Sequence, residues 1–102
     1  MPKFMFAYHG GKKPETPEAI EKVMGAWRNW IAETGAALVE PGDPVGKSKT
    51  VSAKGVADDG GSNPLSGYSI VEVDDMNAAI KIAEACPHLD GGTIEIAEIM
   101  SM

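Results

Sequence analysis

Residues 67–100 read GYSIVEVDDMNAAIKIAEACPHLDGGTIEIAEIM, and this stretch predicts a strand, a helix and a second strand. The first strand covers residues 68–73, where the side chains alternate between two faces. Both sets are partly apolar, so we expect both faces of this strand to be covered. The two sets are Tyr68, Ile70 and Glu72 on one face and Ser69, Val71 and Val73 on the other.

The helix of this stretch has signals at both ends. Asp74 and Asp75 offer side-chain oxygens to the unpaired N–H groups of a helix start, and their charge suits its positive end. Pro87 disfavours helical geometry at Cys86, so we expect the helix to stop there. A short turn and two glycines then lead to a closing strand at residues 93–97. The apolar stripe of the helix consists of Met76, Ala79, Ile80, Ala83 and Cys86.

The residues before this stretch predict a strand and a long helix. Residues 3–9 alternate, and their aromatic side chains share one face that should pack against helices. Thr16-Pro17 is a helix-start signal, because Thr caps free N–H groups and Pro suits the first helical position. Apolar residues at three- and four-residue spacing extend this helix over residues 17–34, with Gly35 as its stop.

Two more strands are predicted between the helices, at residues 36–40 and 48–56, and residues 57–65 have the composition of a mobile loop. The order of elements is then β-α-β-β-β-α-β. Two helices interrupting a mainly antiparallel sheet indicate the α+β class. We expect a ferredoxin-like arrangement with both helices on one face of the sheet.

Such a sheet leaves its second face open. Met5 and Ala7 lie on that face, together with one of the apolar sets of residues 68–73. A monomer would expose these side chains to water. We therefore expect a second copy of the chain to cover them, sheet on sheet, in a two-fold homodimer.

Length and charge limit the classes of function. The chain has 102 residues, so we expect one domain over residues 1–102. Its net charge is −6, and residues 67–100 hold seven acidic side chains and one basic one. An acidic chain without a basic stripe is a poor candidate for binding nucleic acid or an anionic membrane. No apolar run spans a bilayer, no signal-peptide core follows Met1, and one cysteine suits a reducing compartment, so we expect a cytoplasmic protein.

Residues 66–99, SGYSIVEVDDMNAAIKIAEACPHLDGGTIEIAEI, resemble the C-terminal half of the YCII-related (YciI-like, DGPF) domain family. The helix with Trp27 and Trp30, followed by GAALVEPGDPVGKSKTV at residues 35–51, is similar to the remainder of that family. The resemblance covers nearly the whole chain. It implies a ferredoxin-like fold that forms a dimeric α+β barrel with a cleft. Related folds act as isomerases, dehalogenases and monooxygenases on small organic acids.

Some members of that family have a proposed His–Asp pair, which the resemblance does not transfer as a pair. The family histidine lies on the first helix, where the corresponding turn of this chain holds Met24. The family's acidic partner lies near the end of the second strand, where Glu40 and Asp43 are candidates. A histidine elsewhere in the chain would form a new arrangement.

Two residues are candidates for acid–base chemistry. His9 ends the first strand on the face opposite the aromatic side chains, where an imidazole in a cleft can shuttle protons near neutral pH. The alternative is a solvated histidine at a strand end. Asp43 lies in a Gly/Pro loop and can orient a histidine or act as a base, and the alternative is an Asx turn.

Three residues are candidate ligand contacts. His88 follows a helix end, where it can bind an anionic ligand or cap the last carbonyls. Ser66 and Tyr68 begin the strand after the mobile loop and can hydrogen-bond a ligand, although Tyr68 also suits a core or an interface. Cys86 is expected to be a buried small hydrophobe rather than a nucleophile. We expect no cofactor and no metal, because two histidines without paired ligand spacing do not make a metal site.

Two hypotheses follow from the sequence. The first is a homodimer that binds a small organic molecule and catalyses proton transfer without a cofactor, using His9 and Asp43. The second is the same dimer without catalysis, as a ligand-binding or interaction module. Met24 at the helical histidine position favours the second hypothesis, and the polar face of residues 48–56 beside a histidine favours the first.

Overall fold

The structure, a computed structural model, describes residues 1–101. Within this range the chain forms two α-helices, six strands and two short 3₁₀ turns. In chain order the elements are β1 (Lys3–Gly10), α1 (Pro17–Thr34), η1 (Gly35–Ala37), β2 (Leu38–Glu40), β3 (Thr50–Ser52), β4 (Gly55–Ala57), β5 (Leu65–Glu72), α2 (Met76–Glu84), η2 (Pro87–Leu89) and β6 (Gly92–Glu98).

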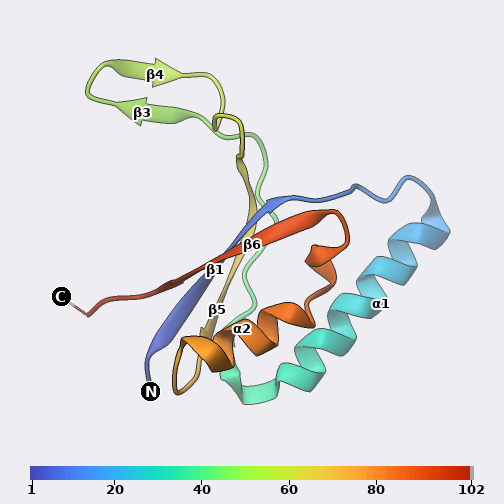
Figure 1. Cartoon of the computed structure of the whole chain (residues 1–102). Coiled ribbons are helices and arrows are strands. Elements are labelled where there is room, and N and C mark those ends of the chain that lie inside the picture. The colour runs from blue at the N-terminus through green and yellow to red at the C-terminus, as the bar shows by residue number, and fades with distance from the viewer. Residues whose placement is uncertain (102) are drawn as a thin grey trace.

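Four strands form one sheet in the order β2-β5-β1-β6. Every neighbouring pair is antiparallel, with β1 between β5 and β6. Figure 1 shows this twisted sheet with α1 and α2 beside it. The fold belongs to the α+β class, as the order of the predicted elements indicates.

The core lies between this sheet and the two helices. β1 contributes Phe4, Phe6 and Tyr8, which form the aromatic face predicted to pack against helices. Trp30 of α1 packs there and donates its indole N–H to the carbonyl oxygen of Ile82 in α2, at 3.0 Å. Both helices therefore cover the same face of the sheet. The other buried core residues are Val71, Val73, Ala79, Ala83 and Cys86.

The predicted helix ends are largely confirmed, because they rest on local signals. The Thr16 hydroxyl accepts a hydrogen bond from the backbone N–H three residues ahead, and α1 ends before Gly35, whose φ is 63°. Asp75 caps α2 in the same way, at 2.9 Å. The second helix ends two residues before Cys86, and a 3₁₀ turn then begins at Pro87.

The single strand predicted at residues 48–56 is wrong. The chain reverses there, and β3 and β4 pair as a hairpin that is separate from the main sheet. Ala53 and Lys54 form its turn, and Gly55 follows with a φ of 135°, a value that side chains rarely tolerate. The strand predicted at residues 36–40 is also shorter, because its first two residues belong to η1.

The hairpin stands clear of the body, on the side away from the two helices (Figure 1). The radius of gyration is 14.9 Å, whereas a compact chain of this length has about 13 Å. The extents of 43 × 43 × 17 Å describe a flat molecule. The hairpin therefore adds surface to the chain without adding to its core.

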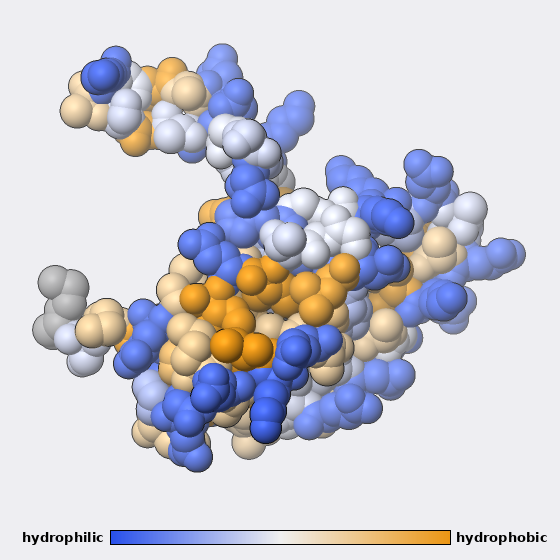
Figure 2. All heavy atoms as spheres, viewed as in Figure 1, coloured by the Kyte–Doolittle hydropathy of each residue, from blue (hydrophilic) through white to orange (hydrophobic). Residues whose placement is uncertain are grey.

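One face of the sheet is not covered by the chain's own helices. Met5 of β1 and Tyr68 of β5 are 40% and 37% exposed on this open face. The expectation that Ala7 is also exposed there is wrong, because the small Ala7 side chain is only 5% exposed between its neighbours in β5 and β6. Figure 2 shows a second apolar area over β6 and α2. Ile80 of α2 is also exposed. Exposed apolar side chains on one face of a sheet are typical of a surface that contacts another molecule.

Candidate functional site

His9 lies on the open face near the end of β1, and its ring is held between two acceptors. Nδ1 lies 2.9 Å from the carbonyl oxygen of Asn63, and Nε2 lies 3.0 Å from Oε1 of Glu95. The His9 side chain is 12% exposed, whereas the Glu95 side chain is 71% exposed. The imidazole is thus nearly covered, and its carboxylate partner stands in solvent.

These two partners determine where the ring carries protons. A carbonyl oxygen only accepts, so Nδ1 carries a proton and donates it to Asn63. An ionised Glu95 also only accepts, so both hydrogen bonds form together only when His9 is an imidazolium. Nε2 is therefore the atom at which a proton can be given or taken. A ligand at this position would compete with Glu95.

Sequence patterns do not single out Glu95 as the partner of His9. The contact depends on the register between β1 and β6, in which His9 pairs with Thr93 and Ala7 pairs with Glu95. Glu95 is then the diagonal neighbour of His9 on the same face of the sheet. Alternation along β6 indicates the face of Glu95, but no local signal sets the register of strands so distant in sequence.

Asp43, the other predicted acid–base residue, lies apart from the His9 ring contacts. Its side chain is exposed in the loop after β2. This loop runs close to β5, because Pro44 forms a bridge with Gly67, and Val45 N donates to the backbone oxygen of Ser66 at 3.1 Å. Within residues 1–101, the carboxylate that hydrogen-bonds to the histidine ring is that of Glu95.

The three predicted ligand contacts lie in different surroundings. Tyr68 is half-exposed on the open face. Ser66 lies where the pairing of β5 with β1 shifts register, and its buried hydroxyl has no hydrogen-bond partner within residues 1–101. Nε2 of His88 hydrogen-bonds to the backbone oxygen of His9 at 2.9 Å, and its ring lies 5.0 Å from that of Tyr8. His88 therefore supports the backbone of His9.

A buried polar group lies on the helix-facing side of β1. The hydroxyl of Tyr8 lies 2.7 Å from Oγ of Ser69, which donates to the carbonyl oxygen of Pro41, also at 2.7 Å. Burial raises the pKa of the Tyr8 hydroxyl well above its ordinary range. Burial also raises the pKa of the Cys86 thiol, although a hydrogen bond from the backbone N–H of His88 acts in the opposite direction. Both groups are therefore protonated at neutral pH.

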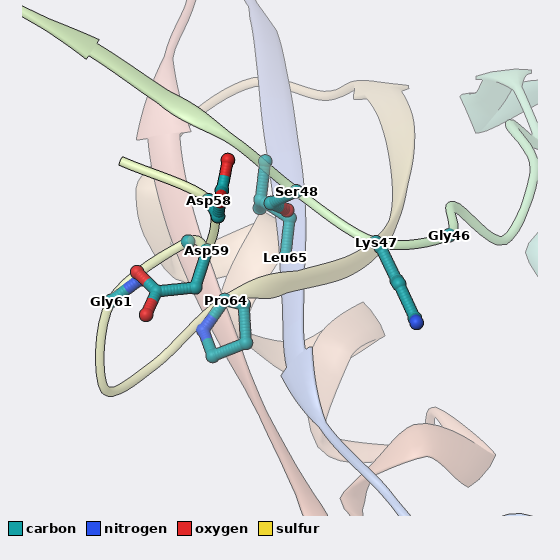
Figure 3. Close-up of a pocket in the computed structure, with 9 residues that line it drawn as sticks. Gly46, Lys47, Ser48, Asp58, Asp59, Gly61, Pro64 and Leu65 are labelled. Carbon is teal, nitrogen blue, oxygen red and sulfur yellow. The ribbon is translucent and has the colours of Figure 1, made fainter. Parts of the chain in front are cut away.

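A shallow hollow of about 270 Å³ lies at the foot of the β3–β4 hairpin. Figure 3 shows Asp58 and Leu65 around it, with Lys47 pointing away. Leu65 also pairs with His9 across the sheet, and the loop that lines the hollow carries Asn63. The hollow is thus on the same loop that holds the His9 ring.

Two further findings concern metal ions and membranes. Within residues 1–101, no three His, Cys, Asp or Glu side chains lie close enough together to hold a metal ion. Neither described helix combines the length and the apolar composition that crossing a membrane requires.

Comparison with known families assigns the chain to a protein family. A family model of the YCII-related domain matches residues 1–102, the whole chain. The chain belongs to the YCII-related domain family. This match confirms the resemblance of residues 66–99 to that family. Comparison with curated proteins found no match.

In this YCII-related domain, the position implied for the family's histidine holds no acid–base group, and the Glu40 carboxylate at the implied acidic position is engaged in a turn. Met24 is 54% exposed on α1, and its thioether neither gives nor takes a proton. Oε1 of Glu40 accepts a hydrogen bond from the backbone N–H of Gly42 at 2.9 Å, which closes a turn. Acid–base chemistry in this YCII-related domain would therefore depend on His9 of β1 rather than on a residue of α1.

Proposed function

We propose that this YCII-related domain works as a homodimer and catalyses cofactor-independent acid–base chemistry on a small organic acid. Each subunit would have the ferredoxin-like arrangement, and the two open sheet faces would meet to form a dimeric α+β barrel. His9 and Glu95 would then lie in a pocket between the sheets, lined in part by Tyr68. The observation that carries the proposal is the His9–Glu95 pair on the open face.

The amount of exposed surface supports the dimer. A folded monomer of this mass, 10.7 kDa, typically exposes about 5,500 Å². This chain exposes 7353 Å², which is about 1,800 Å² more than that typical value. Stable homodimers bury on the order of 1,000 Å² or more from each partner. The exposed side chains of Met5 and Tyr68 would contribute to that buried area.

The topology supports the ferredoxin-like arrangement of each subunit. The strand order β2-β5-β1-β6 is antiparallel throughout, and both helices cover one face. The β3–β4 hairpin is then an insertion between the second and third strands of a β-α-β-β-α-β unit. We propose the cytoplasm as the protein's location, because the reducing conditions there suit a chain with a free, buried cysteine.

The geometry of His9 supports an acidic ligand. Most of the Glu95 side chain is in solvent, so a ligand can displace this carboxylate from the ring without disturbing the core. A ligand carboxylate can then take the same place and accept a hydrogen bond from Nε2. The Asn63 carbonyl continues to hold Nδ1–H, so the ring keeps its orientation while Nε2 exchanges a proton with the ligand.

Exchange of carbon-bound hydrogen with solvent tests the proposal. The protein is incubated in D₂O with a panel of small carboxylic acids that carry an acidic C–H bond, and deuterium uptake is followed by NMR. We expect uptake in at least one compound, and we expect the variant His9→Asn to be slower by about 100-fold or more. Equal rates for the wild-type protein and His9→Asn would contradict a catalytic role for this histidine.

Glu95→Gln and Glu98→Gln form a matched pair for this assay. Both remove one negative charge from β6, but only Glu95 contacts His9. We expect Glu95→Gln to change the rate and its pH dependence, and Glu98→Gln to leave both unchanged. Identical behaviour of the two variants would show that the histidine–carboxylate contact is irrelevant to the reaction.

A non-catalytic binding role is the second candidate. It is favoured by the engagement of both His9 ring nitrogens, which leaves neither free for a substrate unless Glu95 moves. In that case the same panel would show ligand-dependent shifts at the amide of His9 without deuterium uptake. The shifts would weaken in His9→Asn and persist in Glu98→Gln.

A further inference from the structure

The β3–β4 hairpin and the residues that lead into it form an arm, residues 47–57, that adds nothing to the core. Every residue from 49 to 57 is exposed. Val51 and Val56 face each other across the hairpin and are 77% and 63% exposed. A lone two-stranded hairpin is only marginally stable in water, so a well-formed arm indicates a missing partner.

Charge identifies the kind of partner. The arm carries Lys47, Lys49 and Lys54 and no acidic residue, whereas the rest of the chain carries fifteen acidic and six basic side chains. Nζ of Lys49 forms an ion pair with Oδ1 of Asp58, just after the arm, at 3.3 Å. The other two lysines have no ion-pair partner within residues 1–101. A basic arm on an acidic chain is complementary to a second copy of that chain.

The position of the arm identifies where it would bind. The arm stands on the side of the sheet away from the helices (Figure 1). Glu72 and Glu95 lie on the open face of that sheet, beside the exposed Met5 and Tyr68. This face therefore offers carboxylates for the lysines and apolar side chains for the valine pair of the arm.

We infer that the arm of each subunit docks on the open face of the other, close to the partner's Glu95. The arrangement is reciprocal, because in a two-fold dimer each copy gives and receives one arm. The inference rests on the homodimer proposed above. It adds that the His9 site is incomplete in one chain, since the partner's arm roofs it and brings a lysine to the place where an anionic ligand would bind.

Charge reversal in the arm tests this inference by sedimentation equilibrium. Lys47→Glu/Lys54→Glu reverses both unpaired arm lysines, and Lys12→Glu/Lys13→Glu makes the same change of charge in the loop before α1. We expect the arm variant to raise the dimer dissociation constant by about tenfold or more, and the loop variant to change it far less. Equal effects of the two variants would overturn the inference.

A spin label locates the arm in the dimer. The label is attached at Ala53→Cys, the hairpin turn, in a Cys86→Ala background, and the labelled chain is mixed with ¹⁵N-labelled wild-type chain. We expect broadening of partner amides in β5 and β6 near Glu72 and Glu95. A confirmed dimer without such broadening would overturn the arm contact and leave the dimer intact, whereas a monomeric wild-type protein would overturn both.

Nucleic acid is the other acidic partner that the lysines suit, and the same samples test it. Single-stranded RNA of mixed sequence is added to the ¹⁵N-labelled wild-type chain. We expect no change in the arm amides at physiological salt, because the acidic body repels a polyanion. Shifts confined to the arm, together with absent contacts between protein copies, would overturn the inference.

Discussion

Tyr8 carries a hydroxyl group into the apolar layer between β1 and the helices, beside the thiol of Cys86. Burial raises the pKa of both groups, so the folded chain keeps them protonated at a pH at which the unfolded chain releases its protons. The folded state then binds more protons than the unfolded state at alkaline pH. Under this condition the free energy of unfolding falls as the pH rises.

We therefore predict constant stability from these two groups up to about pH 8, and a progressive loss of stability between pH 8 and pH 10. Urea unfolding at each pH, followed by circular dichroism, measures this loss. Cys86→Ala is the control, since it should remove the part of the loss that begins nearest to pH 8.5. A slope of the same size in Cys86→Ala would assign the effect to other groups.

Gly92 leaves room for the imidazole ring of His88. A Cβ atom added at Gly92 would overlap the imidazole of His88, whose Nε2 hydrogen-bonds to the backbone oxygen of His9. We predict that Gly92→Ala costs about 2 kcal/mol of stability, measured by urea unfolding, because the ring must leave this position.

Two variants control this prediction. Gly46→Ala should change stability by less than about 0.5 kcal/mol, because no atom lies within 4 Å of its added Cβ. The double variant Gly92→Ala/His88→Ala should lose less stability than the sum of the two single variants. Simple additivity would show that the overlap with His88 is not the cause.

Within a single element, local sequence signals predict where each helix begins and ends. Thr16, Gly35 and Asp75 act where the sequence indicates, because a cap depends on residues within one turn of it. The hairpin was not predictable in the same way, since alternation continues through residues 48–56 and Ala53-Lys54 is not a typical turn pair. The contact between His9 and Glu95 was not predictable either, because it depends on strand register over 86 residues.

The two aspartates before α2 offer a test of capping. Both lie at the helix start, but the side chain of Asp75 accepts a hydrogen bond from the backbone N–H of Ala78, and Asp74 precedes the cap. We predict that Asp75→Ala is about 1 kcal/mol more destabilising than Asp74→Ala in thermal or urea unfolding. Because both variants remove one charge, equal losses would attribute the effect to charge rather than to the cap.

In the molecule as a whole, the helices cover one face of the sheet and leave the other face open. The helices bury the aromatic face of β1, while the opposite face exposes Met5, Tyr68 and the carboxylate beside His9. The α+β class and the covered face follow from the order and periodicity of the elements. The projecting arm does not, because residues 48–56 alternate without a typical turn pair at Ala53-Lys54.

Sedimentation equilibrium of the unmodified protein over a range of concentrations tests most directly whether a second copy completes this molecule. We predict a mass of about 21 kDa, twice the 10.7 kDa of one chain, at micromolar concentrations. A mass that stays near 10.7 kDa up to the highest concentration would contradict it.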